Sequence, residues 1–224
     1  MNKKTKTYIF FFGPIGSGKG TQSDRLGEKL KLPVISTGEL FRRELKLDTK
    51  FGRQIKKFVT SGKLVTDALT LAILNKRLAK PDAKPGFILD GFPRNRTQLD
   101  HILNKIDGIG QAPKKIIAVY IYVSDQVVKS RIGGRRVCVC GATYHIKFNP
   151  PKNDSLCDVC GKKIFQRDDD KPAAIKTRLG IFHKAVLPLI DLMDKNYRLI
   201  KVNGDAKIER IAEEIYRQVS KAIK

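Results

Sequence analysis

The sequence contains no apolar run that approaches the ~20 residues needed to span a bilayer. Its first segment, MNKKTK, is basic, but the apolar stretch behind it is too short for a signal peptide and continues into a glycine-rich loop. We therefore expect a cytoplasmic protein. Internal repeats and low-complexity segments are also missing, and 224 residues suffice for one α/β domain with a small insert and a sizeable core.

Acidic residues are scarce: 22 Asp and Glu stand against 45 Lys and Arg, which gives a formal net charge of +23. Such an excess attracts polyanions, either to a nucleic-acid surface or to an arginine-rich nucleotide site. The lysines are scattered and form neither a long block nor a tract in which basic and aromatic residues alternate. We therefore favour the nucleotide site and expect only weak, nonspecific retention on nucleic acid at low salt.

Cysteine is absent outside one short segment, which holds all four: Cys138, Cys140, Cys157 and Cys160. In a cytosolic enzyme such clustering indicates a metal site before disulfides. The surrounding residues, 137–166, also contain two adjacent prolines and several glycines and show little helical pattern. They predict a small inserted subdomain that a metal ion holds together.

The segment GPIGSGKGT, residues 13–21, is the most informative stretch of the chain. It follows an apolar run at 8–12, which predicts a buried strand, and precedes residues 22–31, which predict a helix. Glycines let the backbone approach an anion, N–H groups at the helix N-terminus face it, and Lys19 adds a charge for the outer phosphates. The alternative, a glycine-rich turn without a ligand, is disfavoured by these flanks. Gly20 follows the lysine and the hydroxyl comes at Thr21, a form that resembles the nucleoside monophosphate kinases.

Short apolar runs alternate with helical patterns along the chain. The runs that predict strands are 8–12, 33–35, 87–89, 116–123 and 199–202. The segments that predict further helices are 69–78, 97–106, 125–131, 173–196 and 207–222. This alternation predicts an α/β fold, a doubly wound parallel five-stranded sheet with helices on both faces and ligands outside the carboxyl ends of the strands. Residues 37–66 form a helical excursion between the second and third strands.

Two polar segments follow predicted strands. In LDGFPR, residues 89–94, Asp90 ends a strand where a carboxylate can hold Mg²⁺ or its water shell, and Arg94 follows on the loop. A merely polar turn is the alternative. In STGELFR, residues 36–42, Ser36 or Thr37 can cap the next helix, which alone would explain them. Arg42 lies about one helical turn further on, at a useful distance for a phosphate.

Arginines stand on both sides of the cysteine segment. Arg131, Arg135 and Arg136 precede it, whereas Arg167 and Arg178 follow it. If the insert closes like a lid, these side chains come together around transferring phosphates, to which guanidinium groups donate as a fork. Surface arginine is the alternative, above all for Arg136.

Taken together, these motifs resemble the adenylate kinase family, in the long form that carries a lid. The resemblance extends over residues 7–220, and its motifs appear in the family's order: GPIGSGKGTQ (13–22), STGELFR (36–42), GKLV (62–65), GFILDGFPRNRTQ (86–98), RIGGRRVC (131–138), YHIKFNPPK (144–152), QRDDD (166–170) and VNGD (202–205). It implies a P-loop core at 1–36, 67–136 and 167–224, an AMP-binding subdomain at 37–66 and a lid at 137–166.

The resemblance implies the reaction ATP + AMP ⇌ 2 ADP with Mg²⁺, in a site that the closed lid shields from water. It implies a catalytic set of Lys19, Arg94, Arg135, Arg167 and Arg178. The residues implied in ATP binding are Gly16, Ser17, Gly18, Lys19, Gly20, Thr21, Arg131, Arg135, Thr143 and Tyr144. Those implied in AMP binding are Thr37, Arg42, Lys63, Leu64, Val65, Gly91, Phe92, Pro93, Arg94, Gln98, Arg167 and Arg178, with Gln98 at the adenine edge. Asp90 would belong to the Mg²⁺ shell, and Asp169 and Asp170 would latch the closed lid.

The metal site that the resemblance implies is a structural Zn²⁺ site in the lid, with Cys138, Cys140, Cys157 and Cys160 as ligands. The second pair, Cys157-Asp-Val-Cys160, has the family's spacing, whereas the first, Cys138-Val-Cys140, is one residue short. Zinc bound by all four thiolates is the interpretation that we favour. Three cysteines with His145 or water, and four unpaired or oxidised thiols, stay open.

Two other functions stay open as well. A kinase for UMP or CMP would share the P-loop, but Thr37, Gln98 and the long cysteine-bearing lid argue against it. A zinc-ribbon protein that binds nucleic acid and carries a P-loop core would explain the positive charge but not the complete arginine set. Nothing in the sequence demands more than a monomer. The expected partners are ATP, AMP and ADP, without specific nucleic acid or membrane.

Overall fold

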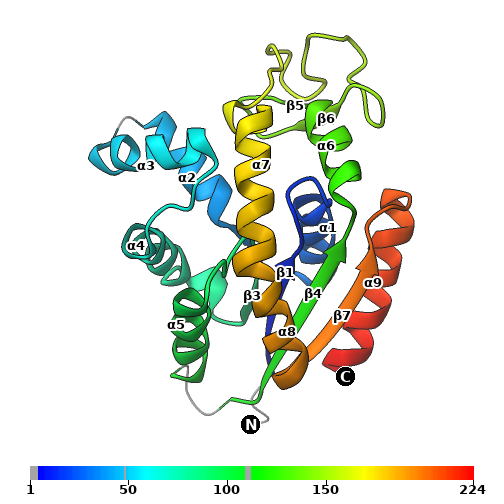
Figure 1. Cartoon of the computed structure of the whole chain (residues 1–224). Coiled ribbons are helices and arrows are strands. Elements are labelled where there is room, and N and C mark those ends of the chain that lie inside the picture. The colour runs from blue at the N-terminus through cyan, green and yellow to red at the C-terminus, as the bar shows by residue number, and fades with distance from the viewer. Residues whose placement is uncertain (1–4, 48, 109–111) are drawn as a thin grey trace.

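A parallel sheet forms the centre of the molecule (Figure 1). The structure is a computed structural model that describes residues 5–47, 49–108 and 112–224. The strands of this sheet are β1 (Lys6–Phe12), β2 (Val34–Ser36), β3 (Gly86–Asp90), β4 (Lys114–Tyr122) and β7 (Arg198–Asn203), in the order β2-β3-β1-β4-β7. Each neighbouring pair is parallel, so the predicted five-stranded parallel sheet is confirmed.

The strand order places a crevice beside β1. From β1 the chain passes to β2 and β3 on one side of the sheet, and then crosses to β4 and β7 on the other side. Loops that leave neighbouring strands in opposite directions open a crevice at the carboxyl edge, where α/β sheets bind ligands. The glycine-rich loop follows β1, and Asp90 ends the adjacent β3 in register with Phe11.

Helices cover both faces of this sheet, as predicted. On one face α4 (Asp67–Leu78), α5 (Arg96–Asp107) and α8 (Leu187–Asn196) pack their apolar side chains on Phe10 and Phe12. On the other face α1 (Lys19–Leu30) and α9 (Ile208–Ile223) pack on Ile9 and Phe11. Because successive residues of a strand point to opposite faces, a strand buried on both faces must be apolar at consecutive positions. Among the described residues, no helix combines the length and the apolar character that a bilayer span requires.

The segment 173–196, predicted as one helix, is helical throughout but not uniform. Helix α7 (Pro172–Ile181) passes into a π-helical turn, η3 (Phe182–Val186), before α8 begins. In this turn Leu187 donates its backbone N–H to the carbonyl oxygen of Phe182, five residues back. Pro188, in the first turn of α8, has no backbone N–H and cannot donate the α-helical hydrogen bond to the carbonyl oxygen four residues back. The wide turn accommodates the proline, so the predicted helical segment is confirmed but contains a π-helical turn that its pattern does not show.

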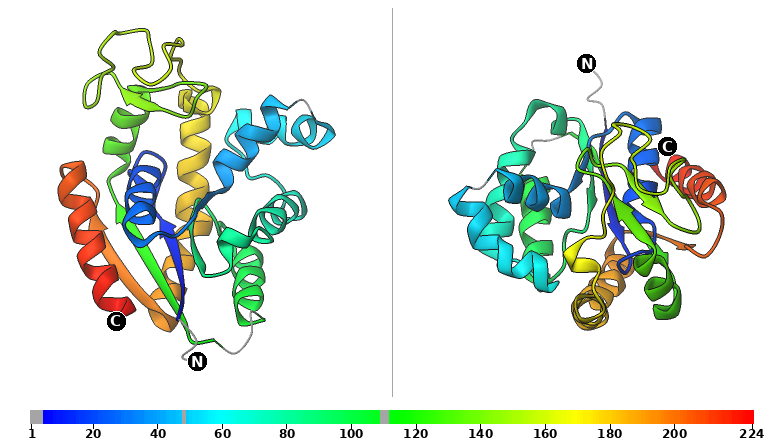
Figure 2. Two further views of the ribbon diagram at one scale, coloured as in Figure 1. Left: turned by 180° about the vertical axis from the view of Figure 1, so that it is seen from behind. Right: turned by 90° about the horizontal axis from the view of Figure 1, so that it is seen from above.

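Two excursions extend beyond the carboxyl edge of the sheet (Figure 2). The first consists of α2 (Thr37–Lys46) and α3 (Lys50–Ser61), in agreement with the helical excursion predicted for 37–66. The second follows α6 (Asp125–Gly133) and begins with an antiparallel hairpin of β5 (Arg135–Val137) and β6 (Thr143–His145). Lys46 of α2 donates from Nζ to the carbonyl oxygen of Val139 at 2.8 Å, so the two excursions touch. Two short 3₁₀ turns, η1 (Pro81–Ala83) and η2 (Asp168–Asp170), complete the fold.

A pair of backbone hydrogen bonds closes the base of the second excursion, residues 137–166, which we call the lid segment. The N–H of Val137 donates to the carbonyl oxygen of Phe165 at 2.8 Å, and the N–H of Phe165 donates back at 2.9 Å. The chain therefore enters and leaves the lid segment side by side.

Candidate active site

The glycine-rich loop bends sharply into the start of α1. Gly13 has φ 147°, and a Cβ there would clash with the carbonyl oxygen of Ile121. Gly18 precedes the helix with φ 96°, in the left-handed region that favours glycine. Helix α1 begins at Lys19, three residues before the predicted start at 22, so the lysine stands in its first turn. The N–H groups of a first helical turn have no partner within the helix, which suits an anion such as phosphate.

Lys19 lies back over this loop, and its Nζ donates to the carbonyl oxygen of Pro14 at 2.8 Å. Burial lowers the pKa of Lys19 to about 8, although the nearby carboxylate of Asp90 raises it, and three neighbouring arginines lower it further. The ammonium group therefore has one negative and three positive neighbours. A bound phosphate would compensate that charge.

Asp90 ends β3 beside the first turn of α1. Its Oδ2 accepts a hydrogen bond from the hydroxyl of Ser36 at 3.2 Å. A Cβ on Gly20 would lie 3.8 Å from the same oxygen. Carboxylate and water oxygens are the ligands that Mg²⁺ prefers when it accompanies a nucleotide. The position and chemistry of Asp90 thus fit the predicted Mg²⁺ shell.

The hydroxyl groups of Ser36 and Thr37 do not cap α2. Ser36 occupies the N-cap position but makes no side-chain hydrogen bond to the helix, because its hydroxyl binds Asp90. Thr37 is buried, and its Oγ1 donates to the carbonyl oxygen of Gly91 at 3.0 Å. The capping interpretation is therefore wrong: both hydroxyls tie the start of α2 to the end of β3.

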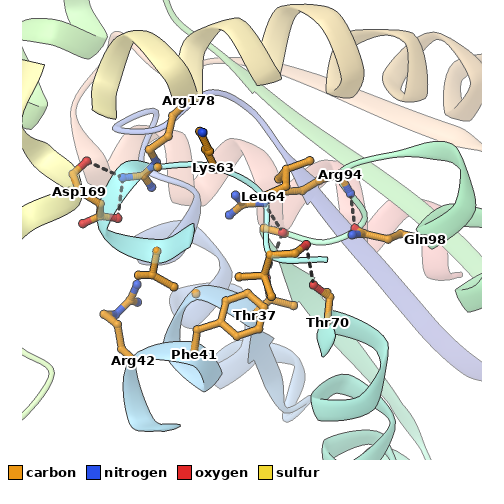
Figure 3. A pocket seen from close by; sticks show the side chains of 15 residues that line it. Thr37, Phe41, Arg42, Lys63, Leu64, Thr70, Arg94, Gln98, Asp169 and Arg178 are labelled. Carbon is orange, nitrogen blue, oxygen red and sulfur yellow. Dashed lines mark hydrogen bonds and ion pairs between the residues drawn. The ribbon is translucent and has the colours of Figure 1, made fainter. Parts of the chain in front are cut away.

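A cavity lies between the end of β3 and the first excursion (Figure 3). Most of the predicted AMP-binding residues line it: Thr37, Arg42, Lys63, Leu64, Val65, Gly91, Arg94, Gln98 and Arg178. Phe92 is instead buried in the core, and Pro93 lines a second hollow beside the glycine-rich loop, together with Pro14 and Lys19. Gly91, Arg94 and Arg178 line both cavities. Two guanidinium groups therefore stand where the two cavities meet.

The chain after β3 fixes Arg94 and Gln98 in this wall. Nε of Arg94 donates to the carbonyl oxygen of Gly91 at 2.7 Å, and its backbone N–H donates to Oε1 of Gln98 at 2.8 Å. Gln98 is 2% exposed. The structure thus places a rigid carboxamide and a guanidinium group side by side on one cavity wall.

Two acids of η2 hold two of the predicted arginines. The buried carboxylate of Asp170 accepts from Nε of Arg135 at 2.9 Å and also from Nη2. The carboxylate of Asp169 accepts from Nη1 of Arg178 at 2.7 Å. Since Arg135 begins the hairpin, Asp170 fastens the base of the lid segment to η2. This is the region in which the resemblance implies a latch.

The arginines around the cavities repel one another. Burial lowers the pKa of Arg178 to about 10, and it does the same for Arg167, whose neighbours Arg42 and Arg135 lower it further. Nε of Arg167 is buried and, within the described part of the chain, has no hydrogen-bond partner. Burial likewise lowers the pKa of Arg42 and Arg94. All of these groups remain charged at neutral pH, so the site is prepared for a polyanion.

Two further predicted arginines lie at the edge of this cluster. Arg131 of α6 pairs with the exposed carboxylate of Asp205 at 3.4 Å. Arg136 is half-buried and donates to the backbone carbonyl oxygens of Gly133 and Arg135.

The two predicted ATP contacts of the lid differ in orientation. Thr143 is exposed, whereas the ring of Tyr144 is buried inside the lid segment. The Tyr144 hydroxyl accepts from the backbone N–H of Asp158 at 2.8 Å and lies 3.3 Å from Sγ of Cys157. A contact between Tyr144 and a nucleotide would therefore involve its backbone.

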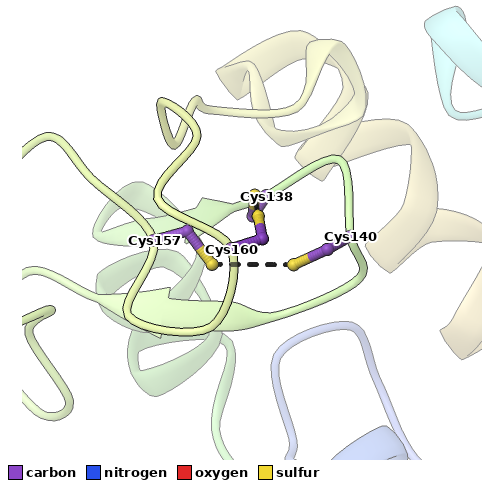
Figure 4. A group of neighbouring side chains, drawn as sticks. All are labelled: Cys138, Cys140, Cys157 and Cys160. Atoms are coloured by element: carbon purple, nitrogen blue, oxygen red, sulfur yellow. Dashed lines mark hydrogen bonds between the residues drawn. The ribbon is translucent and has the colours of Figure 1, made fainter.

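The four cysteines converge in the lid segment (Figure 4). Their Sγ atoms all lie within 4.8 Å of one another, with 3.3 Å between Cys138 and Cys160 and 3.6 Å between Cys140 and Cys157. Tetrahedral Zn²⁺ with Zn–S bonds of about 2.3 Å requires sulfur atoms about 3.8 Å apart. The four thiolates therefore fit a structural Zn²⁺ site. His145 is not a member of this group, since its Nδ1 accepts from the N–H groups of Lys147 and Phe148.

Both cysteine pairs end in the same kind of turn despite their different lengths. Each second cysteine is followed by a glycine with positive φ, 103° at Gly141 and 68° at Gly161. The N–H of Gly141 binds the carbonyl oxygen three residues back, on Cys138, whereas that of Gly161 binds the carbonyl oxygen four residues back, on Cys157. A tighter turn thus compensates for the missing residue, and Cys140 still reaches the cluster.

We expect about one zinc ion per chain in protein prepared without added metal, because four thiolates complete a tetrahedral shell. Elemental analysis checks this, and less than half a zinc per chain contradicts it. Cys140→Ser should lower both the zinc content and the melting temperature of the lid segment. Ser155→Ala, in the same segment, serves as the control and should change neither.

Two residues behind the cavity, Asp67 and Asn95, were not predicted from the sequence. Asp67, at the start of α4, accepts from the side chains of both Gln98 and Asn95. Asn95 caps α5, since its side chain accepts from the N–H of Gln98. The cap of Asn95 has a local signal, an Asn directly before a helical pattern. Asp67 has none that points to Gln98, because the two meet only through the fold.

Comparison with known proteins gives one consistent result. A family model described as adenylate kinase matches residues 11–198. An adenylate kinase of Methanothrix thermoacetophila is 41% identical over 214 residues, which make up 95% of this chain and 98% of the relative. Adenylate kinases of Methanosarcina barkeri and Caldanaerobacter subterraneus are also 41% identical, over 92% of this chain and 95% and 93% of the relatives, respectively.

Proposed function

This chain belongs to the adenylate kinase family, and from that premise we propose that it catalyses reversible, Mg²⁺-dependent phosphoryl transfer from ATP to AMP, giving two ADP. One observation carries the proposal: the cavity beside the glycine-rich loop and the cavity of the first excursion meet at Arg94 and Arg178. Two phosphates, one in each cavity, would face each other across these guanidinium groups. That arrangement suits a transfer between two nucleotides better than hydrolysis of one.

ATP takes the side of the glycine-rich loop. The N–H groups of residues 16–21 and the ammonium group of Lys19 bind its phosphates. Asp90 would hold Mg²⁺ or its water shell, and the bound ion would supply positive charge for the phosphates. Arg131, Arg135, Thr143 and the backbone of Tyr144 contact ATP from the lid segment.

AMP takes the cavity of the first excursion. Its phosphate is held by Arg42, Arg94 and Arg178, which line this cavity, and by Arg167, which lies close enough to Arg42 for their charges to interact. Its base lies against Thr37, Gln98 and the backbone of residues 63–65. In this assignment residues 37–66 are the AMP-binding subdomain and residues 137–166 are the lid, and the rest of the chain is the core.

The protein contributes position and charge to the reaction. An oxygen of the AMP phosphate is already an anion, so no side chain has to remove a proton from it. Lys19 and the arginines stabilise the charge that spreads over the transferring group. Closure of the lid over both nucleotides excludes water, which would otherwise compete with AMP for the phosphoryl group.

Acceptor specificity tests the proposal. In a coupled assay for ADP with ATP as donor, we expect AMP to exceed CMP, UMP and GMP at least about tenfold in kcat/KM, because Gln98 offers a fixed hydrogen-bonding edge. ATP without an acceptor gives the background of hydrolysis. An equal or better rate with a pyrimidine nucleotide would make the chain a UMP or CMP kinase instead.

A further inference from the structure

Asp67 stands at the start of α4, directly behind the AMP cavity, and holds two side-chain amides. Its Oδ1 accepts from Nδ2 of Asn95 and from Nε2 of Gln98, each at 2.8 Å. Gln98 lines the cavity, whereas Asp67 is not among the described residues that line it. Asp67 can therefore influence a bound base only through Gln98.

The carboxamide of Gln98 has one orientation because its two ends meet neighbours of opposite kind. The backbone N–H of Arg94 donates to Oε1 at 2.8 Å, so this end must be the oxygen. The carboxylate of Asp67 accepts and cannot donate, so the other end must be the amino group. Turning the amide around would bring Oε1 against the carboxylate and the amino group against an N–H. Both contacts repel, and the cost is high because Gln98 is buried and half-buried Asp67 lies directly behind it.

We propose that Asp67 is a specificity-determining positioning residue, which selects a 6-aminopurine over a 6-oxopurine by fixing the amide of Gln98. The inference rests on the proposed function. After its contacts to Asp67 and Arg94, the amide keeps one N–H and one oxygen lone pair for a base. Adenine presents an acceptor at N1 beside a donor at N6, and hypoxanthine presents a donor at N1 beside an acceptor at O6. A fixed amide places its donor and acceptor to match the adenine edge only, whereas an amide that turns can match either edge.

The test compares AMP with inosine monophosphate, its 6-oxo analogue, as acceptor for the wild type and Asp67→Ala, with ATP as donor. We expect Asp67→Ala to lower the ratio of kcat/KM for AMP over inosine monophosphate at least about tenfold, the effect of one hydrogen bond in a nearly buried site. The loss should appear in KM for AMP, with kcat at saturating AMP within about threefold of the wild type.

Two variants separate positioning from a general effect on the helix. Asp67→Asn keeps an oxygen acceptor at Oδ1 and should keep the ratio within about threefold of the wild type. Glu209→Ala removes the acid from the first turn of α9, far from the cavity, and is the matched control for lost charge at a helix N-terminus. It should leave the ratio unchanged.

An unchanged ratio in Asp67→Ala, or an equal loss with both acceptors, would overturn the inference, because Asp67 would then have a structural role only. The inference would also be contradicted if Asp67→Asn lowered the ratio of kcat/KM for AMP over inosine monophosphate as much as Asp67→Ala does. If the alanine variant does not fold, Asp67→Ser replaces it, since serine is well tolerated at a helix N-terminus. A wild type that does not prefer AMP over inosine monophosphate would contradict the proposed acceptor itself, so the two failures are distinct.

Discussion

Lys19→Met is expected to lower kcat for AMP phosphorylation about 10³-fold, because one preorganised charge at a transferring phosphate contributes on that order. The same substitution should stabilise the nucleotide-free protein. Folding lowers the pKa of Lys19 from 10.5 to about 8, so keeping it charged at neutral pH costs about 3 kcal/mol. Methionine removes that cost and loses one hydrogen bond to Pro14, worth about 1 kcal/mol.

The pH dependence of unfolding tests the cause of this stabilisation. Since the pKa of Lys19 is lower in the folded than in the unfolded chain, the cost is complete below pH 8 and declines as pH rises toward 10.5. The difference in free energy of unfolding between Lys19→Met and the wild type should shrink over this range, as measured by urea denaturation. Lys195→Met, on the exposed side of α8, is the control and should alter neither kcat nor the free energy of unfolding. Activity within tenfold of the wild type would contradict the role of Lys19.

Arg178→Ala should lower kcat/KM by about 10²–10³-fold for both nucleotides, because this guanidinium group borders both cavities. Arg178→Lys should recover only a small part, since an ammonium group keeps the charge but not the forked donors. The alanine variant also leaves Asp169, 14% exposed, without the arginine that binds it, at a cost of about 1–3 kcal/mol in stability.

Steady-state kinetics with each nucleotide varied in turn measures this effect. Arg217→Ala, whose exposed side chain pairs with Glu214 on α9, is the control for removing an arginine from the chain. A loss confined to one nucleotide would contradict the position of Arg178 between the two cavities. Melting temperatures of all variants separate the kinetic effect from loss of fold.

The parts of the molecule that local sequence patterns determine were predicted well. The three central strands, β1, β3 and β4, are buried and apolar at consecutive positions because helices cover both faces, and that pattern is visible in the sequence itself. The loop at 13–21 and Asp90 could be placed at one edge because parallel strands end on the same side.

Features that depend on contacts between distant segments were missed or wrong. Ser36 and Thr37 looked like helix caps because the local pattern does not show the end of β3, which binds both hydroxyls. Asp67 and Gln98 meet only after α4 and α5 have packed on the same face of the sheet. The π-helical turn before Pro188 has a local cause instead, because the proline has no N–H for the regular helical hydrogen bond.

The two backbone hydrogen bonds between Val137 and Phe165 make the lid segment a unit whose length can vary. Because the chain enters and leaves through two adjacent residues, the residues between them can change in number without displacing α6 or η2. The one-residue difference at Cys138-Val-Cys140 is an example, since the turn at Gly141 absorbs it inside the lid segment. We therefore expect that a segment of another length, or one without a metal, can replace it between the same two residues while α6 and η2 keep their positions.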